Sequence, residues 1–362
     1  MTILYILAAL LMLGVMVLIH EAGHFFAARA TGIPVSEFAI GFGPKIKSWK
    51  SKKHETVFSI RAIPAGGFCA FYGEDDPKAD NQHDARALRN FPVWKRVITI
   101  VMGPVMNFVL AFVVCFAYVM GVGFVEADYG RPHIIEVTED SPAGRAGLMA
   151  DDFIESINGI SAAGLDENGN YRMNALIDGF KSGDPALQVV VTRGDEQQTI
   201  FIAPEYNEEY GRFMIGITMQ IETLNERKIT PSIGEGISYA FDLCVTEGTQ
   251  ILDSLRQLVT GKVGLDQASG PVGVVQIVVE QTREYGFEAY LSLLIFISVN
   301  LGLVNLLPIP GLDGSRLIFL IIEGIRRKPV PQKVEAYINL AGLALLMILF
   351  VFLTCQDVGR LF

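Results

Sequence analysis

Residues 4–30 read LYILAALLMLGVMVLIHEAGHFFAARA, an apolar run long enough to cross a bilayer as a helix. His20, Glu21 and His24 lie inside this run in the spacing H-E-x-x-H. Hydrocarbon cannot solvate ionisable side chains, so such residues within a span indicate a function. Residues four apart share one helical face, which puts both imidazoles on one side with a carboxylate nearby. The pattern predicts a metal site held within the membrane.

Three further apolar runs are long enough to span, at about 97–125, 290–308 and 334–355. A chain of 362 residues that is 51% hydrophobic can supply four spans and one soluble domain of ordinary size. The first run could instead be a signal peptide, but it lacks a basic start and a small-residue cleavage site. We therefore expect a multi-pass α-helical membrane protein that contacts the lipid bilayer, and we expect no nucleic-acid partner.

Charge divides the chain into two parts. Residues 126–288 carry a net charge of −16, whereas the rest of the chain carries +6. Basic side chains gather between residues 29 and 96 and again after Pro310. The positive-inside rule predicts that both basic segments are cytoplasmic. Four spans then place both termini and the acidic section outside, with HEAGH near the cytoplasmic end of the first span.

Turn residues and hydrophobic periodicity predict how the rest of the chain is organised. Short strands are expected at 35–40, 56–63 and 68–72, too few for an independent soluble core. A separate α+β domain is expected to contain a helix at 172–183, a hairpin turning at Gly194-Asp195 and a strand at 213–219. The expected segments are span one with HExxH (1–30), a cytoplasmic-side, membrane-associated β-region (31–92), span two (93–125), an extracytoplasmic α+β domain (126–222), an amphipathic linker region (223–288), span three (289–310), a cytoplasmic-side helix following LDG (311–333) and span four (334–356).

The segment 231–260 has apolar residues at mixed helical spacings, interrupted by acidic ones. It cannot span a bilayer. Two placements stay open for a helix of this kind: it lies on the outer membrane face, or it packs against the soluble domain as an ordinary globular helix does.

Catalytic zinc needs three protein ligands and an open position for water. His20 and His24 supply two ligands, and Glu21 is placed to take a proton from the zinc-bound water. Asp313 is the best third ligand, because two prolines in NLLPIPGLDG (305–314) break the helix just before it. A plain helix-capping role for Asp313 stays open. The other histidines lie in extramembrane segments and are expected to be ordinary surface residues: His54, His83 and His133.

Two asparagines in apolar spans have both a structural and a functional interpretation. Asn305 could hydrogen-bond substrate or the developing oxyanion, or it could simply join two helices. Asn107, in GPVMN (103–107), offers the same choice. Gly103 and Pro104 of that motif would let the second span approach the metal-binding helix closely.

These pieces together resemble the site-2 protease family of intramembrane zinc metalloproteases, and within it the bacterial RseP-type regulators. The resemblance rests on motifs that follow the family's order, namely HEAGH (20–24), GFGP (41–44), PAGGF (64–68), GPVMN (103–107), SGPVG (269–273) and NLLPIPGLDG (305–314). It implies that His20, His24 and Asp313 bind Zn²⁺, that Glu21 is the catalytic base and that Asn305 helps to hold substrate. It also implies that Gly66, Gly67 and Phe68 belong to a membrane-associated β-element that binds substrate as an added strand.

The resemblance extends to the middle domain, where EDSPAGRAGLMADDFIESING (139–159) looks like a bacterial PDZ domain. It implies a protein of the bacterial inner membrane whose PDZ domain is periplasmic. Its substrates would be single-span proteins such as anti-sigma factors, or signal-peptide remnants, already trimmed outside the membrane. Such a domain could capture a peptide C-terminus, with residues 143–148 as the binding loop, or it could only block access.

Two features depart from the family pattern. The chain has room for one PDZ domain where some relatives have two, and it has Ser315 where the family often has a second glycine. Two other functional classes remain as alternatives to a protease. A membrane adaptor with a vestigial metal site would bind less than about one zinc per chain. A transporter would need inverted repeats of broken helices, whereas only one broken segment is apparent, at 308–310.

Overall fold

The computed structural model describes residues 2–52, 55–73, 84–166, 171–207, 211–262, 264 and 269–360. Internal contacts divide the chain into two compact units. The first unit combines Met1–Val122 with Pro231–Phe362, and the second is Gly123–Thr230. The second unit is therefore an insertion in the first.

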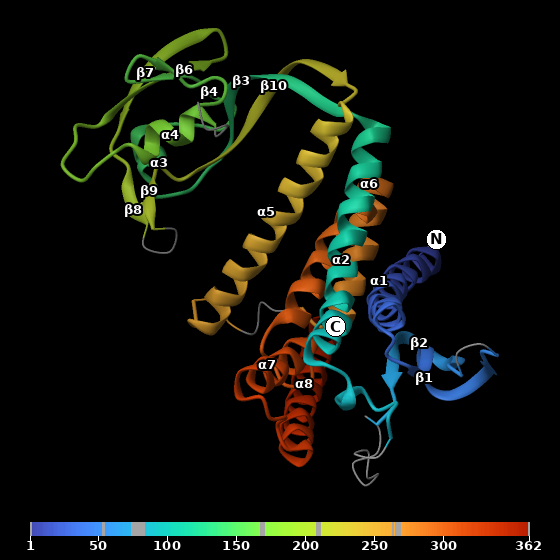
Figure 1. Cartoon of the computed structure of the whole chain (residues 1–362). Helices are drawn as coiled ribbons and strands as arrows, with labels where there is room; N and C mark the ends of the chain where they lie inside the picture. Colours follow the sequence, from blue (N-terminus) through green and yellow to red (C-terminus); the bar gives the residue numbers. More distant parts are fainter. Residues whose placement is uncertain are drawn as a thin grey trace. The chain divides into compact units, whose positions relative to one another are not determined.

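Four helices in the first unit are long and apolar enough to cross a membrane (Figure 1). They are α1 (Thr2–Thr31), α2 (Val93–Val122), α6 (Pro271–Leu306) and α8 (Gln332–Arg360). The length and apolar composition of these helices confirm the prediction of a multi-pass membrane protein with four spans. The side chains exposed along α8, such as Leu345, Ile348 and Phe352, are apolar, as expected for a surface that faces lipid.

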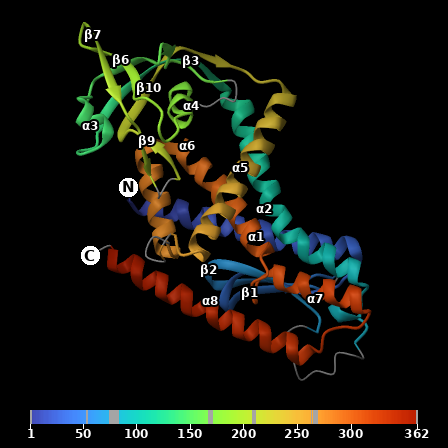
Figure 2. The ribbon, with the colours of Figure 1, turned by 90° about the vertical axis from the view of Figure 1, so that its left-hand side faces the viewer.

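The third candidate span differs from its prediction at its beginning. Helix α6 starts at Pro271, where the sequence predicted a linker region, and it turns at Gly286 (Figure 2). Gly286 has φ 76° and ψ −152°, a conformation open to glycine but not to other residues at low cost. The helix ends at Leu306, two residues before Pro308, as the missing amide and ring of proline require.

Helix α5 (Ile233–Val259) begins with a capping box, in which Ser232 and Glu235 each satisfy an amide of the other. It runs beside α2 and also contacts α6 (Figure 1). The contact with α2 is close at Gly236, where an added Cβ would lie 3.2 Å from the Phe116 ring. The interrupted apolar pattern of this segment did not predict packing along two spans.

The first unit also contains a β-hairpin next to α1, formed by β1 (Val35–Lys50) and β2 (Val57–Phe71). Residues 35–40 pair with 67–71 on one side and with 57–60 on the other. Residues 45–50 pair with the outer side of 57–61. Among the described residues, 67–71 therefore pair on one side only and form an edge of this small sheet.

The second unit is an α+β domain with a sheet of order β10-β3-β4-β6-β7, to which β5 adds beside β4. Its core contains Ile134, Ile154, Val189, Val191 and Ile202, all at most 1% exposed. The remaining elements are α3 and α4 and a separate β8–β9 hairpin. Their bounds are β3 Phe124–Val137, α3 Pro142–Ala146, β4 Phe153–Ile157, β5 Ile160–Ser161, α4 Arg172–Asp178, β6 Leu187–Arg193, β7 Glu196–Ile202, β8 Glu205–Asn207, β9 Arg212–Met214 and β10 Ile217–Ile229.

Several local predictions for this unit can be compared with the structure. The hairpin at Gly194-Asp195 is confirmed, because Arg193 pairs with Glu196. The helix predicted at 172–183 ends earlier, at Asp178. The strand predicted at 213–219 is two strands, since Gly216 with φ 78° separates β9 from β10.

Residues 143–148 do not form the carboxylate-binding loop that the sequence suggested. They contain most of α3 and the turn after it, where Gly147 has φ 90°. The amides of this segment already donate within the chain, to Ile215, Ser141, Gly144 and Ala143. They are therefore not available to a peptide carboxylate.

Candidate metal centre

The candidate site forms where α1 and α2 approach each other closely. A Cβ added at Gly103 would lie 2.2 Å from Nε2 of His24, and one added at Gly23 would lie 2.3 Å from the Met102 carbonyl oxygen. Any side chain larger than hydrogen at either position would push the helices apart or displace the ring. The prediction that Gly103 permits close approach to the metal-binding helix is confirmed.

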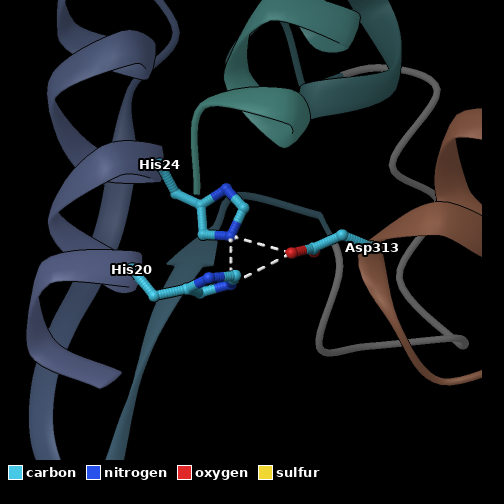
Figure 3. A group of neighbouring side chains, drawn as sticks. All are labelled: His20, His24 and Asp313. Carbon is cyan, nitrogen blue, oxygen red and sulfur yellow. Dashed lines mark hydrogen bonds and ion pairs between the residues drawn. The ribbon is translucent and has the colours of Figure 1, made fainter. Parts of the chain in front are cut away.

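Three donor atoms converge beside this contact, two from α1 and one from Asp313 (Figure 3). Oδ2 of Asp313 lies 3.0 Å from Nε2 of His20 and 3.2 Å from Nε2 of His24. The two Nε2 atoms are 3.2 Å apart. Both histidines are buried, at 7% and 6% exposure.

The spacing of these atoms fits a tetrahedral zinc site. Ligands at about 2.0–2.1 Å from a tetrahedral ion lie about 3.3–3.4 Å from one another. The three observed distances of 3.0–3.2 Å are close to that value. Two imidazoles with one carboxylate form a common donor set for catalytic zinc, which leaves the fourth position for water.

Asp313 reaches the site because the chain breaks before it. It is the first residue of α7 (Asp313–Arg326), whose N-cap is Leu312, and no side-chain capping bond is present. The alternative of a plain N-cap aspartate is therefore wrong. Gly314 allows this turn to be tight, since a Cβ there would lie 2.1 Å from the Leu307 carbonyl oxygen.

Helix α2 also orients both imidazole rings. Nδ1 of His24 lies 2.9 Å from the Thr99 carbonyl oxygen, to which it donates. Nδ1 of His20 lies 3.2 Å from Nδ2 of Asn107. Thr99, Gly103 and Asn107 are four residues apart, so they share the face of α2 that meets α1. Thr99 was not singled out from the sequence, although this spacing around Gly103 was a usable signal.

Glu21 lies next to the three donors but contacts a different element. Its carboxylate accepts a hydrogen bond from the backbone N–H of Cys69 in β2. Gly67 of the same strand is so close that an added Cβ would lie 3.7 Å from Cγ of Glu21. The Cys69 amide therefore points toward α1, away from the paired side of the strand.

The predicted substrate-binding residues lie in two elements, β2 and α6. Gly66, Gly67 and Phe68 are in β2, and the Phe68 ring stacks against Phe42. Asn305 lies near the end of α6 and is half-buried, with no hydrogen bond of its side chain among the described residues. The interhelical hydrogen bond that was its structural alternative is therefore not observed there.

The remaining histidines do not join the cluster in the described part of the chain. His133 is in the second unit, where it stacks on Phe153 and pairs with Asp151. His54 and His83 lie outside the described residues.

A second polar cluster, centred on Glu37, joins β1 to β2 in the hairpin next to the site. The Glu37 carboxylate accepts hydrogen bonds from Ser59 and Arg61 of β2 and from Lys45, farther along β1. Burial alone would raise the pKa of Glu37, but these hydrogen bonds and the charge of Arg61 hold it below the ordinary value. The carboxylate therefore stays charged and joins the strands at neutral pH.

Comparison with known proteins identifies the family. Residues 8–349 match the model of peptidase family M50. The chain is 31% identical to the regulator of sigma-W protease RasP of Bacillus subtilis, with 99% of each chain covered. The zinc metalloproteases RasP of Bacillus licheniformis and Oceanobacillus iheyensis are 31% and 30% identical, again over 99% of each chain. The chain belongs to peptidase family M50, the site-2 proteases, and is a multi-pass membrane protein and a zinc metalloprotease.

Proposed function

We propose that this protease cuts peptide bonds within transmembrane segments, with His20, His24 and Asp313 as its zinc ligands and Glu21 as its general base. The observation that carries the proposal is the convergence of three metal-binding atoms, two of them on a candidate span, at distances suited to zinc. Ionisable residues within a span indicate a functional site, and a site at that depth is accessible to the transmembrane segment of a substrate.

The chemistry divides between the metal and the chain. Zinc at this site would supply Lewis-acid activation of water and of the scissile carbonyl. Glu21 takes the proton from the attacking water and passes it to the leaving amine. The Cys69 N–H holds the Glu21 carboxylate beside the ligands without making it one of them.

The edge formed by residues 67–71 offers a place for the substrate. A helical segment hides its amides in its own hydrogen bonds, so it must unwind before attack. Pairing with the edge of a sheet replaces those hydrogen bonds. Because the Cys69 amide on this edge contacts Glu21, a strand added here would pass next to the general base. Asn305, whose amide makes no hydrogen bond to the residues that the structure describes, is assigned to substrate or oxyanion binding.

The proposed location is the bacterial inner membrane, with both termini and the second unit on the periplasmic side and the active site near the cytoplasmic side. Support comes from the basic segments at 29–96 and after Pro310. The proposed substrates are single-span proteins such as anti-sigma factors, or signal-peptide remnants. The name of the Bacillus subtilis relative, a regulator of sigma-W protease, supports the first class.

The second unit is proposed to be a PDZ-like domain that controls access to the site or holds a peptide. With residues 143–148 excluded as its binding loop, the better candidate is a cavity of about 180 Å³ lined by α4, by residues 212–217 and by Met219. Met173, Ile177 and Phe213 give this cavity an apolar wall that could take a peptide side chain.

Glu21→Gln tests the mechanism directly. The variant should keep its zinc and its fold but lose cleavage of a single-span substrate, measured by mass spectrometry of the products in lipid vesicles. Asp253→Asn, an exposed change on α5, is the matched control and should cleave normally. Wild-type cleavage by Glu21→Gln would refute the assigned base. Zinc below about one per chain in the wild type would instead favour the adaptor.

A further inference from the structure

Asn107 is a fully buried polar side chain beside the metal centre, with 0% exposure. Its Nδ2 atom is 3.2 Å from Nδ1 of His20. Its Oδ1 atom is buried and has no hydrogen-bond partner within the described part of the chain. An unpaired buried amide oxygen costs about 1–3 kcal/mol, so its position next to the site requires an explanation.

The position of the ring hydrogen on His20, Nδ1 or Nε2, supplies that explanation. If Nδ2 of Asn107 donates to Nδ1 of His20, the ring proton must be on Nε2, which then has no lone pair for a cation. A ring that binds zinc through Nε2 carries its proton on Nδ1 and needs an acceptor there. The two ends of an amide have the same shape, so turning the Asn107 amide by 180° puts Oδ1 in that place. One rotation thus gives Oδ1 a hydrogen-bond donor and allows the zinc-binding tautomer, and it moves Nδ2 to the place that Oδ1 now occupies.

His24 already shows the same arrangement. Its Nδ1 donates to the Thr99 carbonyl oxygen, which leaves Nε2 free to bind a cation. Both acceptors would then come from one face of α2, two helical turns apart. The backbone near Asn107 is itself held, because the Ser298 hydroxyl of α6 donates to the Asn107 carbonyl oxygen at 2.8 Å.

We propose that Asn107 is a positioning residue whose Oδ1 accepts the Nδ1 proton of His20 and holds that ring in the tautomer that presents Nε2 to zinc. This proposal rests on the proposed role of His20 as a zinc ligand. Asn107 touches neither substrate nor metal in this role. Its effect is on metal affinity, and activity changes only as a consequence.

Two substitutions separate acceptance by Oδ1 from donation by Nδ2. Asn107→Leu has a similar size but no acceptor, and it should weaken zinc binding about 10- to 100-fold. Asn107→Asp keeps an acceptor oxygen but cannot donate, so its zinc affinity should stay within about threefold of wild type, a difference of about 0.7 kcal/mol. Affinity is measured on the purified full chain by competition with a chromogenic chelator, with Asn300→Leu in α6 as the control. Visible spectra after Co²⁺ substitution report the ligand geometry independently of activity.

The possible results separate this proposal from the ligand assignment. His20→Ala is measured in parallel and should lose zinc. If His20→Ala keeps wild-type affinity, the ligand set is wrong and the present proposal is overturned with it. If His20→Ala loses zinc while Asn107→Leu binds normally, only the role of Asn107 is overturned. Loss of zinc in Asn107→Asp would show that donation by Nδ2 matters, which contradicts the proposal even if Asn107→Leu does not fold.

Discussion

Arg96 of α2 and Glu323 of α7 form a two-point ion pair, in which both terminal guanidinium nitrogens donate to the carboxylate, Nη1 at 3.0 Å. Both side chains are largely buried, at 8% and 15% exposure. The Nε atom of Arg96 also donates to the Phe91 carbonyl oxygen. The pair therefore joins α2, which orients the two histidine rings, to α7, which carries the third donor, Asp313.

Glu323→Gln should lower both stability and zinc affinity. The substitution leaves the Arg96 charge buried without a full partner, which costs about 3 kcal/mol in comparable buried pairs. Because α7 loses an anchor about three turns from Asp313, zinc should also dissociate more readily. The measurements are the midpoint of thermal unfolding in detergent and the rate of zinc loss to a chelator. Unchanged values for both would show that this ion pair does not hold the third ligand.

Gly103→Ala should displace His24, whereas Gly121→Ala in the same helix should not. An alanine Cβ at position 103 would lie 2.2 Å from Nε2 of His24, but one at position 121 meets nothing within 4 Å. We expect zinc affinity to fall at least about tenfold in Gly103→Ala, or about 1.4 kcal/mol. Gly121→Ala should bind zinc normally and be slightly more stable, since alanine favours the helix. Equal zinc affinities in the two variants would refute the close packing of α1 and α2 at this point.

Much of this centre could be predicted from the sequence because its determinants are local. Four-residue spacing puts His20 and His24 on one face whatever the rest of the chain does. The prolines at 308 and 310 end α6 by sterics alone, which leaves Asp313 at the start of a new helix. Apolar length likewise predicted four spans, because hydrocarbon requires it.

Features that depend on tertiary contact were not accessible in this way. The Thr99 carbonyl oxygen and the Cys69 N–H are backbone groups, which every residue type carries except that proline has no N–H. The packing of α5 along α2 depends on Gly236 fitting against Phe116, which no periodicity reveals. The turn of α6 at Gly286 was also missed, because an isolated glycine in a helical pattern is usually tolerated.

Asp357→Ala should destabilise the C-terminal span and α6 together. Asp357 lies near the end of α8, and its buried carboxylate accepts hydrogen bonds from the Gly270 and Gly273 amides, at 3.1 and 2.7 Å. These amides lie at the start of α6, in the motif SGPVG (269–273). A Cβ added at either glycine would lie within 3 Å of a carboxylate oxygen of Asp357, so the close contact requires glycine at both positions. Hydrogen bonds to a charged acceptor contribute about 1.5–3 kcal/mol, and thermal unfolding should show a loss of that order. Gly359→Ala, which meets nothing within 4 Å, is the control.

Gly67→Ala should impair cleavage more than it impairs zinc binding. A Cβ at this position would lie 2.7 Å from the Ala39 carbonyl oxygen, so the strand must move away from its partner in β1. The same strand provides the Cys69 amide that holds Glu21, and it forms the edge on which substrate is proposed to pair. The three proposed zinc ligands, His20, His24 and Asp313, belong to α1 and α7, and they should keep their geometry. We expect a fall in kcat of at least about tenfold, equivalent to about 1.36 kcal/mol, with one zinc per chain retained.

Gly14→Ala is the control. A Cβ added at this position of α1 meets no atom within 4 Å, so both measurements should stay unchanged. If Gly67→Ala cleaved at the wild-type rate, the edge of β2 would have no part in placing substrate beside Glu21.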